Sequence, residues 1–229
     1  MAIVKKYPSE VVSVENKIDN IYTVTFKSLA GHYKYAPGQF LHLALDEVDP
    51  SAGWPESRCF SMQSAPGGET TAITYAAKGT FTQRMASELK PGKTVTLKLP
   101  YGELFTDDFN REKVVFIAGG TGITPYLSLF CHSSFADYVN PILYLGVRNQ
   151  TLNIYKNEIE QAKAINPGLS VHIICEDTDG RLNIERIAKE YGSHSVYFIS
   201  GPPVMIKSFK TYLAENGIDE ASIKTDDWE

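Results

Sequence analysis

The chain has 229 residues, a length that accommodates either one large domain or two small ones. Hydrophobic residues make up 43% of it and charged residues 21%, which excludes a disordered or fibrous protein. No apolar stretch approaches the roughly 20 residues of a membrane-spanning helix. The first ten residues also lack the apolar core of a signal peptide. We therefore expect a globular protein with no membrane segment.

The cysteines are few and widely spaced. Cys59, Cys131 and Cys175 form no CxxC pair, and three thiols are too few for a four-thiolate zinc site or an iron–sulfur cluster held by this chain alone. The five histidines show no metal-ligand spacing either, so no metal site is predicted. Reduced thiols of this kind indicate a cytoplasmic location.

The net charge of −5 argues against a nucleic-acid-binding protein. The charge is distributed unevenly, because residues 1–107 carry 11 basic and 11 acidic side chains whereas residues 108–229 carry 11 and 16. The first half therefore has no overall basic surplus with which to attract an acidic partner, although a local patch is still compatible with that balance.

The first half is rich in short segments of strand type. We expect strands over Val11–Ile18, Ile21–Phe26, Gln39–Leu45, Thr71–Ala77 and Thr94–Leu99. Pro-Gly turns separate them, a pattern typical of an antiparallel barrel or sandwich. One helix is expected near Phe81–Lys90, with Thr80 or Thr82 as its N-cap.

The second half alternates between apolar strands and helices. The expected strands are residues 114–118, 142–147, 171–175 and 196–200, and the expected helices are residues 125 onward, 154–165, 184–191 and 204–216. This alternation predicts a parallel, doubly wound sheet. The polar stretch Asp107–Glu112 separates the two patterns, so we expect two domains, residues 1–107 and 108–229.

Two loops of the second half follow predicted strands directly. Residues 119–125 read GGTGITP, in which glycines permit close backbone approach and the helix start offers N–H groups to a phosphate, with Thr124 as N-cap. Residues 200–205 read SGPPVM. Loops at the carboxyl ends of parallel strands meet in one crevice, where such sheets bind ligands. A tight strand–helix turn and a Gly-Pro helix start are the alternative interpretations.

Two segments of the first half are also candidates for ligand binding. Residues 58–61 read RCFS, and in a strand Arg58 and Phe60 share one face. Residues 78–82 read KGTFT, a glycine turn that opens a helix and forms a candidate anion site.

Five short motifs follow one another along almost the whole chain. In order, they are Arg-x-aromatic-Ser, Gly-x-x-Thr, GGTGxTP, Gly-x-Arg and GPPxM. Over about residues 8–228 the sequence resembles the ferredoxin–NADP reductase superfamily, especially its flavin reductase and oxygenase-reductase branches. The resemblance implies an α+β two-domain protein. An antiparallel β-barrel flavin-binding domain over 1–107 would precede a doubly wound parallel α/β NAD(P)-binding domain over 108–229.

For the flavin, the resemblance implies that Arg58 pairs with the pyrophosphate, a role that suits its planar donor fork. Phe60 would pack on the isoalloxazine, where the family usually has Tyr, and Ser61 would donate near flavin N5. The further flavin-binding residues implied are Ile73, Thr74, Tyr75, Gly79, Thr80 and Thr82.

For the nucleotide, the resemblance implies a second set of residues. Those that would receive or flank it are Gly120, Thr121, Gly122, Pro125, Gly201, Pro202 and Met205. Ser200 stands where the family often has Cys beside the nicotinamide, so Ser61 and Ser200 are the expected catalytic residues. Trp228 either covers the flavin or packs on the last strand.

The nucleotide preference is expected to follow from Glu176. NADPH-specific family members carry Ser and Arg after the third strand of this half, where this chain has Cys175-Glu176-Asp177. A carboxylate there would repel a 2′-phosphate and could accept from ribose hydroxyls, which favours NADH. Arg148 argues the other way, because it could meet a phosphate.

The function implied by the resemblance is hydride transfer from NAD(P)H to bound FAD, with FMN as the alternative flavin. Electrons would then pass to a separate acceptor protein, either an iron–sulfur or a flavin protein. Two alternatives stay open: a flavin reductase or diaphorase that reduces free flavin or small acceptors, and a non-autonomous subunit of a larger electron-transfer complex. A general base is not required, since the flavin supplies the chemistry.

Overall fold

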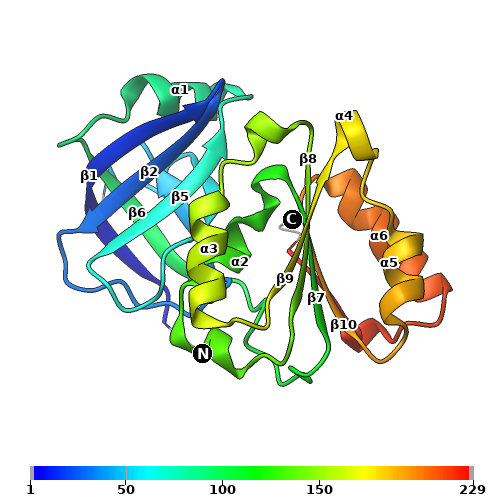
Figure 1. The fold of residues 1–229 in the computed structure, drawn as a ribbon. Coiled ribbons are helices and arrows are strands. Elements are labelled where there is room, and N and C mark those ends of the chain that lie inside the picture. The colour runs from blue at the N-terminus through cyan, green and yellow to red at the C-terminus, as the bar shows by residue number, and fades with distance from the viewer. Residues whose placement is uncertain (1–2, 50, 227–229) are drawn as a thin grey trace. The chain divides into compact units, whose positions relative to one another are not determined.

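The computed structural model describes residues 3–49 and 51–226. It divides into two compact units, Met1–Phe105 and Thr106–Glu229, each of which is considered by itself (Figure 1). The boundary expected from the sequence, between residues 107 and 108, lies two residues after that division.

The first unit is built on a six-stranded antiparallel sheet in the order β4-β3-β6-β1-β2-β5. Its elements are β1 (Lys5–Ile18), β2 (Ile21–Ser28), β3 (Phe40–Ala44), β4 (Ser57–Ser61), β5 (Thr70–Ala76), α1 (Thr80–Glu88) and β6 (Thr94–Tyr101). Alternate residues of these strands point inward, as in Leu41 and Leu43 or Leu97 and Leu99, and all four are fully buried. The predicted antiparallel barrel-like domain is confirmed.

The second unit is built on a five-stranded parallel sheet in the order β11-β10-β7-β8-β9. Its strands are β7 (Val114–Gly119), β8 (Ile142–Val147), β9 (Ser170–Cys175), β10 (Val196–Ser200) and β11 (Ile223–Thr225). Its helices are α2 (Thr124–Phe130), α3 (Lys156–Ile165), α4 (Glu176–Asp179), α5 (Ile184–Tyr191) and α6 (Pro203–Glu215). Short 3₁₀ turns cover Gly120–Ile123, Ser133–Asp137, Gln150–Leu152 and Glu220–Ser222.

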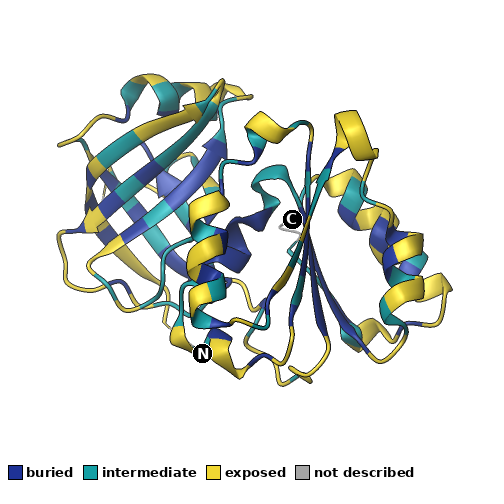
Figure 2. Cartoon of the chain, in the orientation of Figure 1, coloured by how far each residue is buried: buried dark blue, intermediate teal, exposed yellow. Residues whose placement is uncertain are grey.

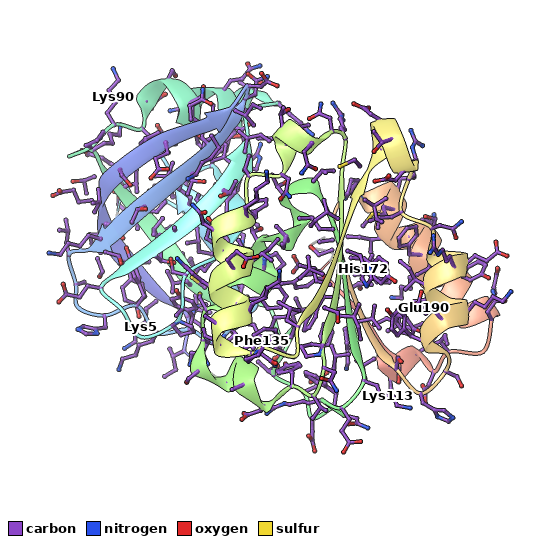
Figure 3. All side chains as sticks on the ribbon, viewed as in Figure 1. Lys5, Lys90, Lys113, Phe135, His172 and Glu190 are labelled. Carbon is purple, nitrogen blue, oxygen red and sulfur yellow. The ribbon has the colours of Figure 1, made fainter. Side chains whose placement is uncertain are left out.

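Helices cover both faces of this parallel sheet. Figure 1 shows α2 and α3 on one side of it and α5 and α6 on the other. In Figure 2 the sheet-facing sides of α3, α5 and α6 are buried and their outer sides are exposed, whereas α2 is buried throughout. An aromatic cluster that includes Phe116, Phe130 and Phe135 packs on one face (Figure 3 labels Phe135). The predicted doubly wound parallel α/β domain is confirmed, and the continuous apolar runs of β7 and β10 are explained by helices on both faces.

Two helix starts differ from expectation. Helix α1 begins at Thr80 with Gly79 as its N-cap, and Thr82 is the third helical residue rather than the cap. Helix α2 begins at Thr124 itself, whose Oγ1 donates to the carbonyl of Thr121 at 2.9 Å. The reason is that the 3₁₀ turn at 120–123 runs directly into α2, which leaves no extended residue to act as an N-cap.

Two short elements could not be predicted from the sequence. Strand β11 has three residues, of which only Ile223 is buried, and α4 has four residues, none of them buried. Elements of this length are too short to show an apolar period. Within residues 3–49 and 51–226, no helix combines the length and the apolar character needed to cross a bilayer.

Candidate functional sites

A pocket of about 400 Å³ lies in the first unit, where β4 meets the N-terminus of α1. It is lined by Arg58, Cys59, Phe60, Ala76, Lys78, Gly79, Thr80, Phe81 and Thr82. The fold thus brings together two segments about twenty residues apart in the chain, and five of the predicted flavin-binding residues line the same cavity. Lys78, which the resemblance did not single out, joins them.

The start of α1 gives one wall of the pocket a positive character. The first-turn N–H groups of a helix lack intrahelical acceptors, and the helix dipole adds positive potential there. A Cβ atom at Gly79 would meet nothing within 4 Å, so the approach to the backbone is open. Thr82 holds the turn, because its Oγ1 accepts from the N–H groups of Gly79 and Lys78 at 3.1 and 3.0 Å.

Arg58 places a guanidinium at the same pocket. Its Nη2 donates to Glu56 Oε1 at 2.9 Å, and its Nη1 donates to the carbonyl of Ser57 at 2.8 Å. The guanidinium also lies 5.1 Å from the ring centre of Phe81. About half of the Arg58 side chain is exposed, at 51%, so it is accessible to a ligand. Arg58, Lys78 and the helix start together suit a phosphate group.

Phe60 and the predicted flavin residues outside the pocket lining lie deeper in the unit. Phe60 is 9% exposed and packs edge-to-face with Tyr75, with ring centres 6.0 Å apart. Ser61 ends β4 and is buried, as are Ile73, Thr74 and Tyr75 on β5. Of these, only Phe60 belongs to the lining of the pocket.

The hydroxyl of Tyr75 is buried and has no hydrogen-bond partner among the described residues. Burial raises the pKa of Tyr75 well above its usual range, which keeps the group neutral. We expect Tyr75→Phe to leave the free energy of unfolding of the apoprotein unchanged or to increase it, since an unsatisfied hydroxyl is removed. Urea unfolding measures this.

The control for that substitution is Tyr33→Phe. The Tyr33 hydroxyl is also in the barrel core, but it donates to Ser9 Oγ at 2.8 Å. Its loss is expected to cost about 1 kcal/mol. A larger loss for Tyr75→Phe than for Tyr33→Phe would contradict the prediction.

In the second unit, the two predicted glycine loops meet at the carboxyl ends of β7 and β10. A Cβ atom at Gly122 would lie 2.5 Å from Cα of Gly201, and one at Gly119 would lie 2.8 Å from Cδ of Pro202 and 3.0 Å from Sδ of Met205. The loops therefore pack backbone against backbone. Gly120 has a φ of +56° and open space around it, which leaves room for a ligand.

The other predicted residues of these loops take specific positions. Thr121 lies in the 3₁₀ turn and Pro125 in the first turn of α2. Ser200 is 2% exposed, and its Oγ donates to Asp226 Oδ2 at 3.2 Å. Asp226 in turn donates its N–H to the carbonyl of Ile199, so the segment after β11 is tied to β10. Nothing in the sequence pointed to Asp226, and Trp228 lies outside the described residues.

Arg148 and Glu176 follow neighbouring strands, β8 and β9. The carbonyl of Arg148 accepts from the N–H of Asp177 at 3.1 Å, which ties the two loops together. Glu176 Oε1 accepts from Arg181 Nε at 2.7 Å, and the Arg181 side chain is 85% exposed. Glu176 is therefore not a lone carboxylate, a pairing that the sequence reading missed. Across the described ranges, no group of three or more His, Cys, Asp and Glu residues is placed to hold a metal ion.

A barrel-like antiparallel unit with a candidate anion site at a helix start, followed in the chain by a parallel sheet with glycine loops at its carboxyl edge, matches the fold of ferredoxin–NADP-reductase-like proteins. Residues 116–211 match the family model of the oxidoreductase NAD-binding domain. Together with the relatives described next, this match makes the chain similar to reductases of the ferredoxin–NADP reductase superfamily.

Two relatives are reductase components of oxygenase systems. The chain is 26% identical to the propane 2-monooxygenase reductase component of Mycolicibacterium goodii, over 94% of this chain and 65% of that protein. It is 29% identical to the glycine betaine monooxygenase reductase subunit of Pseudomonas aeruginosa, over 81% of this chain and 54% of that protein. The chain thus spans less than two thirds of the length of either relative.

A solved structure shares the fold over its full length. A ferredoxin NADP⁺ reductase from Neisseria gonorrhoeae, with bound FAD and NADP, superposes with a TM-score of 0.81 at 17% identity. The superposition covers 99% of both chains.

Proposed function

We propose that the protein is a flavin-dependent oxidoreductase that passes hydride from NAD(P)H, preferentially NADH, to bound FAD and electrons on to a separate acceptor protein. The observation that carries the proposal is the pocket, where Arg58, Lys78 and the N-terminus of α1 surround a cavity with the rings of Phe60 and Phe81. Two cations and a helix start suit a pyrophosphate, and the rings suit a planar aromatic group. The names of the two relatives support the same activity.

The residues of the first unit would bind and orient the flavin. Arg58 offers a planar, permanently charged donor fork to the pyrophosphate, and Gly79 lets backbone N–H groups approach it. Phe60 supplies an apolar ring without a hydroxyl. When bound, the flavin accepts a hydride and can release electrons singly or in pairs.

The residues of the second unit would hold the pyridine nucleotide. Gly120 leaves open space before the start of α2. The close contact between Gly122 and Gly201 holds the two loops together, and the nucleotide would bind against them. Such precise positioning is the protein's main contribution to hydride transfer. Ser61 and Ser200 are proposed to touch the reacting rings.

Purification of the protein tests the proposal directly. We expect a yellow protein whose extracted flavin has the mass of FAD and which oxidises NADH with ferricyanide as acceptor. A protein that neither binds FAD in a titration nor oxidises NADH with added flavin would overturn the proposal. A mass corresponding to FMN would correct the flavin and keep the activity.

A flavin reductase with a dissociable flavin is the second candidate. It is favoured by the ion pair between Arg58 and Glu56, at 2.9 Å, because Glu56 competes with a phosphate for the guanidinium. We expect Glu56→Gln to tighten flavin binding by roughly two- to fivefold, in line with the modest energy of an exposed ion pair. Flavin fluorescence titration measures this. Weaker binding by Glu56→Gln would show that Glu56 orients Arg58 instead.

The nucleotide preference follows from the carboxylates after β9. We expect kcat/KM for NADH to exceed that for NADPH by on the order of tenfold, since Glu176 and Asp177 would repel a 2′-phosphate. Glu176→Gln is expected to narrow the difference, because it removes one charge and releases the Arg181 guanidinium. Glu185→Gln, an exposed carboxylate on α5, is the control. A tenfold preference of the unmodified protein for NADPH would contradict the prediction.

We propose that the acceptor is a separate iron–sulfur or flavin protein, in keeping with relatives that are named as components of oxygenase systems. A cytoplasmic location is proposed as well. It fits the three cysteines, Cys59, Cys131 and Cys175, none of which forms a disulfide among the described residues.

A further inference from the structure

Strand β9 forms one edge of the second unit's parallel sheet. Among the described residues it pairs with β8 alone, in an unbroken register from Ser170 to Cys175. Figure 1 shows β9 between the two helix layers, with α3 on one side and α5 on the other. A strand in this position presents a row of backbone N–H and C=O groups that no neighbouring strand of the sheet can pair.

This edge lacks the features that usually prevent pairing with another chain. Its six residues read SVHIIC, without lysine, proline or carboxylate, and its pairing with β8 shows no bulge. Val171, Ile173 and Ile174 are β-branched and only half-buried. Natural proteins protect exposed edges with charges, prolines, bulges or very short strands. An unprotected edge of this length and composition favours pairing with a further strand.

Two contacts show which residues of β9 turn their backbone groups to the free edge. The N–H of Ser170 donates to the carbonyl of the residue before β8 at 2.9 Å, so Ser170 faces β8. The N–H of Cys175 instead donates at 2.9 Å to a side chain outside the sheet, so Cys175 faces away from β8. The direction alternates along a strand. Val171 and Ile173 therefore turn their N–H and C=O groups outward.

The outward groups are complementary to those of a second copy of β9. Two copies that run antiparallel about a twofold axis can pair Val171 of each with Ile173 of the other, which forms four hydrogen bonds. A shift of two residues in either direction would need the N–H of Cys175 or of Leu169. Both of these N–H groups already donate within their own chain. One symmetric register is therefore favoured.

His172 would lie opposite its own copy on the twofold axis. The residue is exposed, and its ring stacks on that of Tyr144, with ring centres 4.5 Å apart and an angle of 13° between the planes. Figure 3 shows His172 on the side of the sheet that α5 covers. Residues opposite each other in such a non-hydrogen-bonded pair have Cα atoms about 4.5 Å apart. A permanent charge at this position would therefore face the same charge in the partner.

The helices on either side of the edge carry balanced charge. Helix α3 has two basic and two acidic residues, and so has α5. The acidic α4 follows the end of β9, beyond the residues that would pair. The acidic excess of the second half thus lies outside α3, α5 and β9. Two copies of this edge can approach without strong like-charge repulsion.

We propose that the protein forms a symmetric dimer through β9, in which the parallel sheets of two copies join edge to edge. Val171 and Ile173 of each copy exchange backbone hydrogen bonds with Ile173 and Val171 of the other. The interface is isologous, since the same strand serves both copies, so the assembly closes at two chains. The dimer follows from the second unit's sheet and does not depend on the proposed function.

Sedimentation velocity of the whole protein across a dilution series tests the dimer. We expect a species of about twice the 25.4 kDa of the chain, which dissociates on dilution. His172→Lys places two ammonium groups opposite each other and is expected to raise the dimer dissociation constant by on the order of tenfold or more. His194→Lys is the matched control, because His194 is also exposed on the second unit but lies outside β9.

Val171→Pro is the second variant. It removes an outward N–H, and proline is tolerated in an edge strand where the N–H does not bond to the sheet. Two of the four intermolecular hydrogen bonds are lost, so the dissociation constant should again rise, while circular dichroism confirms the fold. In the unmodified protein, amide hydrogen exchange of residues 170–175 should slow as the dimer forms.

Four results would overturn the proposal. The first is a protein that stays monomeric at every concentration. The second is a dimer that both His172→Lys and Val171→Pro leave intact, and the third is a dimer that His194→Lys weakens as much as His172→Lys does. The fourth is a dimer whose formation leaves hydrogen exchange in β9 unchanged, because the interface would then lie elsewhere.

Discussion

Replacing Arg58 with alanine is expected to weaken flavin binding by roughly 10- to 100-fold. The guanidinium lines the pocket opposite the start of α1, and it is the permanently charged fork that can meet a pyrophosphate there. A hydrogen bond to a charged group contributes about 1.5–3 kcal/mol, which sets the size of the effect. The loss of the ion pair with Glu56 contributes little, because both side chains are about half exposed.

Arg84→Ala is the control for this variant. Arg84 lies on the same unit and in α1, where it pairs with Asp46 and Glu88, but it does not line the pocket. We expect the flavin dissociation constant to rise only for Arg58→Ala, while the thermal unfolding of the two apoproteins changes by similar small amounts. If both variants retained flavin equally, Arg58 would not be part of the site that binds the flavin phosphates.

The second unit shows why its strands could be predicted from the sequence and its short elements could not. Every residue of β10, and all of β7 except its final glycine, is buried, so these strands are unbroken apolar runs bounded by polar residues. Strand β11 depends on one buried side chain and on pairing with Tyr197 and its neighbours in β10, an interaction between distant segments. Local pattern carries no information about such pairing.

The site residues also divide into those that could be predicted from the sequence and those that could not. The role of Arg58 was predicted from the family resemblance and that of Gly79 from a glycine turn that opens a helix, and both residues line the pocket. Arg181 and Asp226 were missed, since their significance comes from hydrogen bonds to Glu176 and Ser200 that only the folded chain reveals. The ordered series of motifs gave the resemblance to the superfamily, whereas these hydrogen-bond partners are particular to this chain's packing.

Composition also conceals where the charged side chains of the first unit lie relative to one another. Residues 1–107 are balanced in charge, and that balance argued against a basic docking surface. The sheet register places Lys6 beside Lys98 although they are far apart in the chain, while Glu15, Glu56 and Glu88 are paired with other basic groups. A net charge averages over positions that the fold separates, so local potential has to be judged from strand pairing.

Gly122→Ala is expected to separate nucleotide binding from flavin binding. A Cβ atom at this position would lie 2.5 Å from Cα and 2.6 Å from the backbone N of Gly201, and 2.6 Å from the carbonyl O of Ser200. Backbone atoms cannot rotate away, so one of the two loops must shift by several tenths of an ångström or more. A displacement of about 1 Å at a site of hydride transfer costs on the order of 100-fold in rate.

We therefore expect kcat/KM for NADH to fall by on the order of 100-fold in Gly122→Ala, while the flavin content stays that of the unmodified protein. Gly53→Ala is the control, because a Cβ atom there would meet nothing within 4 Å. Arg58→Ala should show the reverse pattern, with flavin lost and NADH binding, measured by calorimetry on the apoprotein, retained. If Gly122→Ala kept its NADH kinetics, the contact between the two glycine loops would not form the nucleotide site. If it lost flavin as readily as NADH, the two sites would not be separable in this way.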